Sequence, residues 1–391
     1  MRLFYTRIFT LGLLVMGLLL SSCSSVDDED ASLLPSPLPD FETTLKIKPL
    51  WSVGTSASIK GAFSRIQPAI AYDKVYVVGS SGIVEARAIE TGKKIWSTET
   101  GAFIESGVAA ASNIVVVGSE EGEVIALDAK TGKELWRNLV SSEILSPAAI
   151  GEGFVVVRTV DGKLFGLDAK SGERKWFFDR NVPILTLRGT SSPIISRGAV
   201  VAGFDNGKVA LFLLENGKPI WEKRIAQSAG RSELERIVDM DAKPLLVGDS
   251  LYAVTYNGNI ASINVRTGQV NWQREMSSFQ NISTDGLRLY ITTADDEVKA
   301  LSINGGATFW TQKSLLNRKL SAPVVAGDYV VVTDFEGYIH WMSVKDGHFV
   351  KRQHLTSSGI SGNPVVKGRY LAIQGRDGDL MMVKIPETTY Q

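Results

Sequence analysis

The stretch ALDAKTGKELW at residues 126–136 returns along the chain in altered form. Each copy has an apolar segment, a turn that contains glycine, and a second segment that ends in tryptophan. The other copies are RAIETGKKIW (87–96), GLDAKSGERKW (166–176), FLLENGKPIW (212–221), SINVRTGQVNW (262–272) and LSINGGATFW (301–310). Their tryptophans follow one another at 40, 40, 45, 51 and 38 residues. The chain from residue 45 onward is therefore a tandem repeat.

Each repeat predicts four short strands. In the second unit they fall at 108–111, 114–119, 123–128 and 134–138. An acidic residue or Asn followed by Gly usually precedes the third strand, and Thr, Ser or Asn followed by Gly usually precedes the fourth. Such pairs are typical of hairpin turns with positive φ. A four-stranded unit repeated every 40–45 residues is typical of an all-β propeller.

Two further units lack the aligned tryptophan. The unit at 332–353 has Lys351 in its place, and Phe349 is expected to substitute on the same strand face. The last unit, 371–385, ends before a fourth strand, and residues 45–54 are expected to supply it. We therefore predict a single eight-bladed β-propeller over residues 45–391, closed by the N-terminal strand in the last blade. Closure removes two exposed strand edges.

The periodic tryptophans have two interpretations. They can stack on sugars, or they can pack as wedges between neighbouring blades. One tryptophan at a fixed place in each blade favours the structural interpretation, because such a ring buries a large apolar area. The predicted structural set is Trp51, Trp96, Trp136, Trp176, Trp221, Trp272 and Trp310.

The N-terminus predicts export and lipidation. Arg2 and Arg7 precede the apolar run 8–20, which is typical of a signal peptide and too short to favour a spanning helix. The run ends in LSSC, and the cysteine, Cys23, is the only one in the chain. This resembles a bacterial lipobox, so we expect a signal peptide at 1–22, an acylated Cys23 and a flexible tether over 23–44. By resemblance to lipoproteins of Gram-negative bacteria, Ser24 rather than Asp after the cysteine implies the outer membrane, facing the periplasm.

The composition excludes some functions. The chain has 42 basic and 42 acidic residues, which gives no sign of a nucleic-acid surface. With one cysteine, no disulfide can form within the chain.

The lipobox and the eight units together resemble the propeller lipoprotein subunit of the outer-membrane β-barrel assembly machinery. The likeness is most specific at LTLRGTSSP (185–193), RIVDMDAKP (236–244) and FEGYIHWMSVKDGHFV (335–350). It implies a non-catalytic subunit without a cofactor that binds the periplasmic POTRA domains of the barrel-forming subunit and assists barrel insertion. Unfolded barrel proteins are expected as a further partner. The resemblance assigns partner binding to Leu185, Leu187, Arg188, Asp239 and Asp241.

The residues themselves support this surface in part. The tryptophan spacing lengthens at 176→221 and at 221→272, which places extra loop beside both segments. Extra loop on a rigid scaffold is where binding residues concentrate, and Arg flanked by Leu has the composition of an interface hot spot. The alternative is that Leu185 and Leu187 belong to the core and that Arg188 pairs with Asp239 or Asp241. An internal pair can also position a binding loop.

Other functions stay open as alternatives. The repeat also resembles that of quinoprotein alcohol dehydrogenases, but their vicinal disulfide is impossible here. A glycan- or peptidoglycan-binding propeller would use exposed Tyr338, His340 and Trp341. A metal site is poorly supported by His340, His348 and His354, which have no cysteine partner.

Overall fold

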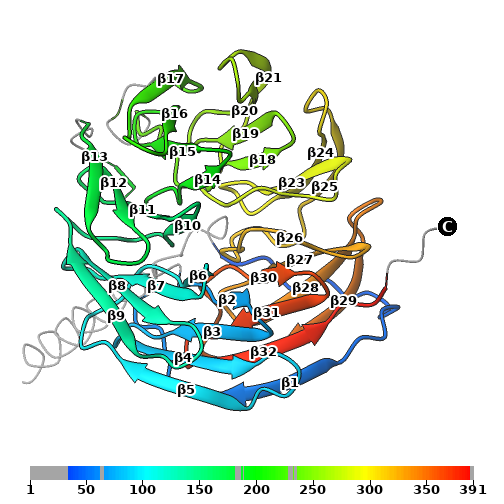
Figure 1. Cartoon of the computed structure of the whole chain (residues 1–391). Helices are drawn as coiled ribbons and strands as arrows, with labels where there is room; N and C mark the ends of the chain where they lie inside the picture. The colour runs from blue at the N-terminus through cyan, green and yellow to red at the C-terminus, as the bar shows by residue number, and fades with distance from the viewer. Residues whose placement is uncertain are drawn as a thin grey trace, which may run out of the picture.

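The computed structural model describes residues 34–61, 66–180, 186–187, 189–227, 232 and 236–387. These residues form eight four-stranded antiparallel sheets arranged in a ring (Figure 1). The innermost strands touch their neighbours around the centre, as β2 touches both β6 and β30. The predicted eight-bladed propeller is confirmed. No helix in the described part of the chain is long and apolar enough to cross a membrane.

Blades one to four follow the chain, each with its strands in order from the centre to the rim. Blade one contains β2 (Ala69–Ala71), β3 (Lys74–Val78), β4 (Ile83–Ala88) and β5 (Lys94–Glu99). Blade two contains β6 (Ala109–Ala111), β7 (Ile114–Gly118), β8 (Glu123–Asp128) and β9 (Glu134–Leu139). Blade three contains β10 (Ala149–Gly151), β11 (Phe154–Arg158), β12 (Leu164–Asp168) and β13 (Arg174–Phe178). Blade four contains β14 (Ile194–Ser196), β15 (Ala199–Phe204), β16 (Lys208–Leu213) and β17 (Pro219–Arg224).

Blades five to seven continue in the same order, and blade eight combines both ends of the propeller. Blade five contains β18 (Leu245–Val247), β19 (Ser250–Val254), β20 (Asn259–Asn264) and β21 (Val270–Glu275). Blade six contains β22 (Ser283–Thr284), β23 (Arg288–Thr292), β24 (Val298–Ser302) and β25 (Thr308–Gln312). Blade seven contains β26 (Val324–Ala326), β27 (Tyr329–Thr333), β28 (Tyr338–Ser343) and β29 (Phe349–His354). Blade eight contains β30 (Val365–Lys367), β31 (Tyr370–Gln374), β32 (Asp379–Lys384) and, at the rim, β1 (Pro49–Gly54).

The N-terminal strand closes the ring as predicted, although it is shorter than the expected 45–54. β1 pairs antiparallel with β32, with Gly54 opposite Asp379 and Pro49 opposite Val383. Residues 45–48 precede the strand and lie against blade seven, where Leu45 and Ile47 are buried.

The two faces of the ring carry different loops. Because the strands of a blade alternate in direction, the links from one blade to the next lie at the same end as the hairpins between second and third strands. We call this the connection face. The hairpins between first and second strands and between third and fourth strands lie on the opposite side, the turn face.

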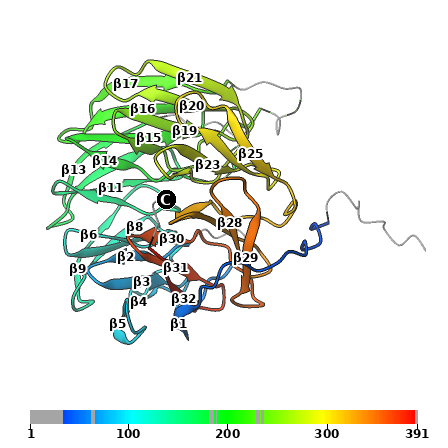
Figure 2. The ribbon, with the colours of Figure 1, turned by 90° about the vertical axis from the view of Figure 1, so that its right-hand side faces the viewer.

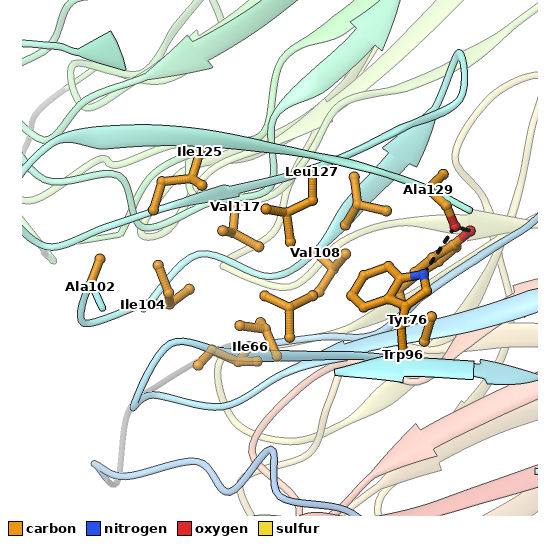
Figure 3. Close-up of a cluster of buried hydrophobic side chains, with 14 of the residues drawn as sticks. Ile66, Tyr76, Trp96, Ala102, Ile104, Val108, Val117, Ile125, Leu127 and Ala129 are labelled. Carbon is orange, nitrogen blue, oxygen red and sulfur yellow. Dashed lines mark hydrogen bonds between the residues drawn. The ribbon is translucent and has the colours of Figure 1, made fainter. Parts of the chain in front are cut away.

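The seven predicted tryptophans connect neighbouring blades at every junction except that between blades seven and eight. Each indole Nε1–H donates to a backbone carbonyl of the following blade at 2.7–3.3 Å. Trp51 of blade eight donates to Ile89 of blade one, so the same bond is also present where the two ends of the ring meet. Around Trp96 the indole meets Tyr76 and the apolar residues between blades one and two (Figure 3). In the structure these indoles pack between neighbouring blades.

In blades one to seven, a glycine before the fourth strand packs against the tryptophan of the preceding blade. Gly92 has a φ of 68°, and a Cβ there would lie 2.7 Å from the Trp51 ring. The same overlap recurs in the following blades, at Gly132, Gly172, Gly217, Gly268, Gly306 and Gly347 with the tryptophan of the blade before. The repeated Gly therefore serves the turn and the blade interface together.

Blade seven departs from the rule, and the prediction for Phe349 is wrong. Lys351 lies opposite Trp341, but the β-bulge that this strand pair shares with the other blades makes Phe349 pair with the next residue, Met342. The bulge turns Phe349 toward blade six, where it packs with Trp310. The large side chain that packs between blades seven and eight is Trp341, on the neighbouring strand and fully buried.

We predict that Trp51→Ala weakens the closed ring. Truncation of a packed tryptophan costs about 3 kcal/mol or more, and here it also removes the bond to Ile89. Urea unfolding should show a lower midpoint, whereas Leu50→Ala, at the exposed neighbouring residue, should leave it nearly unchanged. Equal midpoints for the two variants would contradict the closure role of Trp51.

Candidate partner-binding site

Two long links on the connection face surround blade four. Residues 179–193 join β13 to β14, and residues 225–244 join β17 to β18. They are longer than the other six links between blades, as the tryptophan spacing predicted. Both predicted partner-binding segments lie in them. Leu185 and Arg188 fall outside the described residues, whereas Leu187, Asp239 and Asp241 are described.

The structure brings the two predicted segments together. The backbone N–H of Leu187 donates to the Asp239 carboxylate. Gly189 lies so close to the Asp241 carboxylate that a Cβ at this position would overlap it. Residues 52 positions apart in sequence therefore form one site. Gly189, in the stretch LTLRG (185–189), is needed for this close approach.

The members of the site differ in exposure. Leu187 is 36% exposed, so the interpretation of this leucine as a core residue is wrong. Asp239 and Asp241 are only 1% and 4% exposed. The buried aspartates therefore contact the backbone around Leu187 and Gly189, while the Leu187 side chain faces the solvent.

The stretch from Asp239 to Asp241, which we call the DxD segment, lies between blades four and five. Val238 forms a parallel bridge with Asn206, in the hairpin of blade four. The N–H of Tyr256, in the matching hairpin of blade five, donates to the Asp239 carbonyl at 2.9 Å. Met240, between the two aspartates, is fully buried and packs in the core between these blades. This anchoring gives the loop above it a rigid base.

A buried ion pair lies close to the aspartates. Arg158, at the end of β11, donates to Asp205 at 2.6 Å, and both side chains are almost fully buried. The guanidinium also lies 5.4 Å from the centre of the Phe204 ring. Sequence reasoning missed Arg158, although a signal was present. In every other blade the last residue of the second strand is uncharged.

Burial sets the charge state of the site. It raises the pKa of Asp239 to about 7, and the neighbouring Asp205 and Asp241 carboxylates act in the same direction. The bond from Leu187 and the charge of Arg158 oppose this rise. The carboxyl group that supports the loop is therefore close to half-protonated near neutral pH.

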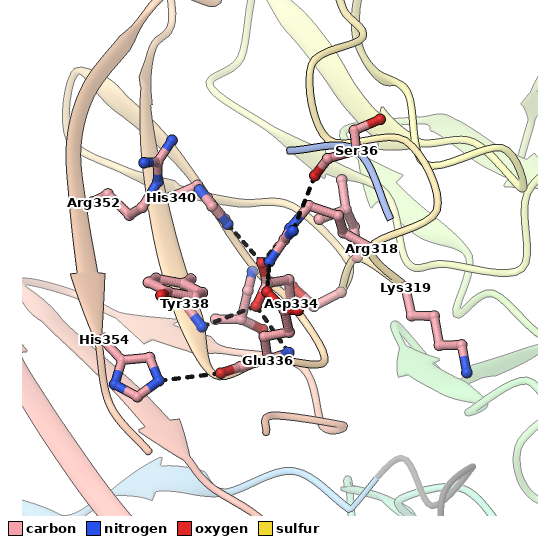
Figure 4. A network of polar contacts seen from close by, with 12 residues as sticks. Ser36, Arg318, Lys319, Asp334, Glu336, Tyr338, His340, Arg352 and His354 are labelled. Atoms are coloured by element: carbon pink, nitrogen blue, oxygen red, sulfur yellow. Dashed lines mark hydrogen bonds and ion pairs between the residues drawn. The ribbon is translucent and has the colours of Figure 1, made fainter. Parts of the chain in front are cut away.

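Two of the three residues expected to bind a glycan are not exposed at the surface. His340 and Trp341 are fully buried, so the expected stacking platform is wrong. His340 Nε2 lies 3.0 Å from the Asp334 carboxylate, which also accepts a bond from Arg318 at 2.8 Å (Figure 4). His340 belongs to an internal polar network of blade seven.

Metal ligands do not gather in the described part of the chain. No group of three or more His, Cys, Asp or Glu side chains there is arranged to hold a metal ion. His348 pairs with Asp346 in an exposed turn, and His354 contacts the Glu336 carbonyl.

The fold is shared with solved propeller structures. Quinohemoprotein alcohol dehydrogenase from Comamonas testosteroni is similar, with a TM-score of 0.69 and 14% identity over 88% of this chain and 78% of that chain. At this identity the likeness defines only the fold class. The crystal structure of BamB from Moraxella catarrhalis is more similar, with a TM-score of 0.80 and 27% identity over 87% of this chain and all of that chain.

Sequence comparison then identifies the family. The family described as outer membrane protein assembly factor BamB matches residues 80–312. BamB of Pseudomonas aeruginosa is 44% identical over 95% of this chain and 98% of its own length. BamB of Escherichia coli K12 is 38% identical over the same shares of the two chains. The chain belongs to the BamB family, and the recognised resemblance is confirmed, as is the prediction of a protein that is not an enzyme.

We predict that Asp239 makes stability depend on pH. The pKa of about 7 in the folded chain lies above the ordinary value of 3.8, so the folded chain keeps this proton to higher pH than the unfolded chain does. The resulting stabilisation is complete below about pH 4 and is lost as the pH rises through about 7.

Asp239→Asn removes this titration and keeps an oxygen that can accept the Leu187 bond. Urea unfolding at pH 5, 6, 7 and 8 should therefore show the variant gaining stability relative to the wild type as the pH rises. Asp249→Asn, at an exposed aspartate, is the control and should differ from the wild type by a constant amount. A constant difference for Asp239→Asn as well would show that the site does not titrate in this range.

Proposed function

We propose that this protein is a non-catalytic scaffold of the outer-membrane β-barrel assembly complex. It binds the POTRA domains of the barrel-forming subunit and assists the insertion of barrel proteins into the outer membrane. Membership in a family named for outer-membrane protein assembly supports the general role. The observation that carries the partner site is the exposed Leu187 held on the buried Asp239.

The arrangement suits protein recognition. A hot spot needs an apolar or Arg anchor with fixed geometry, because binding then costs little conformational entropy. Leu187 is fixed through its backbone by Asp239, which is itself fixed between two blades. In this proposal Leu185, Leu187 and Arg188 make the contact, while Asp239 and Asp241 position the loop.

The proposed location is the periplasmic face of the outer membrane. Residues 1–22 would be removed as a signal peptide, and Cys23 would carry the acyl chains. Stable anchoring requires two or more such chains, each burying its CH₂ groups in the bilayer. The unfolded barrel proteins that the complex inserts are a further proposed partner.

Leu187→Asp should weaken co-purification with the barrel-forming subunit about tenfold, because it places a charge at the centre of an apolar contact. Arg188→Glu should act in the same direction. The matched control is Leu213→Asp, at an exposed leucine of the same blade that ends β16 on the turn face. Affinity purification from envelope extracts, with circular dichroism as a check of folding, measures both. Equal recovery with Leu187→Asp and Leu213→Asp would remove the assigned surface.

Lipidation has its own test. Cells labelled with alkyne-palmitate should incorporate the label into the wild-type chain and not into Cys23→Ser. Label retained by Cys23→Ser would show that another residue is acylated.

A further inference from the structure

Residues 34–48 do not stand away from the ring. They run along the outside of blade seven, and we call them the strap. At its beginning the strap is bonded to the link between β25 and β26. The Ser36 N–H donates to the Leu316 carbonyl at 2.9 Å, and Arg318 donates to the Ser36 carbonyl at 3.0 Å. The start of the strap therefore lies on the connection face.

The middle of the strap fills the junction of blades six and seven. Phe41 stacks on Phe349 with ring centres 5.4 Å apart. The Arg352 guanidinium lies 5.0 Å from the Phe41 ring and donates to the Pro39 carbonyl at 2.8 Å. Leu38 also packs against this cluster.

The end of the strap crosses to the junction of blades seven and eight. The N–H groups of Thr44 and Leu45 donate to the Val350 carbonyl, each at 3.1 Å. Lys351, which occupies the position of the missing tryptophan, donates to the Ile47 carbonyl at 2.6 Å. Leu45 and Ile47 are buried beside Trp341. The strap therefore supplies part of the packing that a rim tryptophan supplies elsewhere.

Charged groups at blade seven orient the arginine that bonds to the start of the strap. Arg318 is 3% exposed and is held by the Asp334 and Glu336 carboxylates, which orient it toward the Ser36 carbonyl (Figure 4). Arg318, which is buried, and Arg352, which is half-buried, each donate to a backbone carbonyl of the strap. The strap is therefore held by specific polar contacts. Figure 2 shows the segment, in blue, leaving the ring beside β29.

The strap changes the face from which the chain leaves the ring. Pro49 begins β1 at the turn face, because β1 reaches the connection face at Gly54, opposite Asp379 and next to the hairpin of blade eight. Without the strap the chain would leave the propeller at Pro49 on the turn face. With the strap it leaves at Leu34, beside Asn317 on the connection face.

The strap also shortens the stretch of chain between the ring and the acylated Cys23. Cys23 precedes Leu34 by 11 residues and Pro49 by 26. At about 3.5 Å for each extended residue, the two lengths span at most about 40 Å and about 90 Å. We propose that the strap turns the connection face of the ring toward the bilayer that holds Cys23. This rests on the lipid anchoring in the proposed function, and it places Leu187 on the membrane-facing side.

The test compares two labels on blade six of the lipidated full chain. The labels are attached to cysteines in Asp295→Cys, in the hairpin of the connection face, and Asn304→Cys, in a hairpin of the turn face, because acylation consumes the Cys23 thiol. Strands of five or six residues separate the faces by about 20 Å. Energy transfer to an acceptor on headgroups of phosphatidylethanolamine and phosphatidylglycerol vesicles should be at least about twofold more efficient from position 295.

The strap is tested by loosening it. Leu38→Ala with Phe41→Ala removes its apolar contacts, and faster amide exchange at residues 36–45 reports its release. Transfer from the two positions should then become nearly equal. The matched control, Glu42→Ala with Lys46→Ala, changes two exposed strap residues and should keep the wild-type difference.

Three results would overturn the proposal. Equal or inverted transfer in the wild type would show that the connection face does not face the bilayer. An unchanged difference after release of the strap would show that something else orients the ring. A chain that does not associate with vesicles would overturn the lipid anchoring as well, whereas co-purification of the partner tests the Leu187 surface independently.

Discussion

The structure depends on a contact repeated around the ring, in which an indole from one blade rests on a glycine of the next blade and bonds to its backbone. The bond matters because a buried indole N–H without an acceptor would cost stability. The glycine matters because a side chain at its position would occupy the space of the ring, as Gly92 shows for Trp51. The contact between Trp51 and blade one makes the array closed, and a closed array gives its loops fixed positions.

That rigidity explains how buried charges can serve a surface loop. Asp205, Asp239 and Asp241 lie close enough to influence one another, an arrangement that burial alone would penalise. Arg158 compensates part of this cost, and the Leu187 N–H uses one carboxylate as its acceptor. The polar cluster therefore connects the blade interface to the loop that carries the exposed Leu187.

Sequence reasoning recovered the features that follow from period and spacing. The blade count, the rim tryptophans, the closing strand and the long links on either side of blade four all repeat or interrupt a regular pattern. It failed where one residue changes direction. The β-bulge that recurs in the outer strand pair of the blades puts Phe349 on the strand face opposite to that of Lys351, whereas regular alternation predicts the same face. It also placed Trp341 and His340 at the surface, because an alternating strand pattern does not say that both faces of a blade are buried.

The contacts of residues 34–48 were likewise beyond prediction from sequence. A proline-rich polar stretch is typical of a free tether, and only the structure shows Arg318 and Arg352 donating to its carbonyls. The absent tryptophan at Lys351 was the visible sign that something else fills that position. Local composition cannot tell an extended segment in solvent from one that lies against a distant blade.

The most direct measurement of the central claim is site-specific photocrosslinking in living cells. A photoreactive amino acid at position 187 should crosslink to the barrel-forming subunit, because the side chain there is exposed on a loop that the DxD segment fixes. The same amino acid at position 213, on the opposite face of blade four, should give no such product. The account would be contradicted if position 187 failed to crosslink to that subunit, or if both positions crosslinked equally.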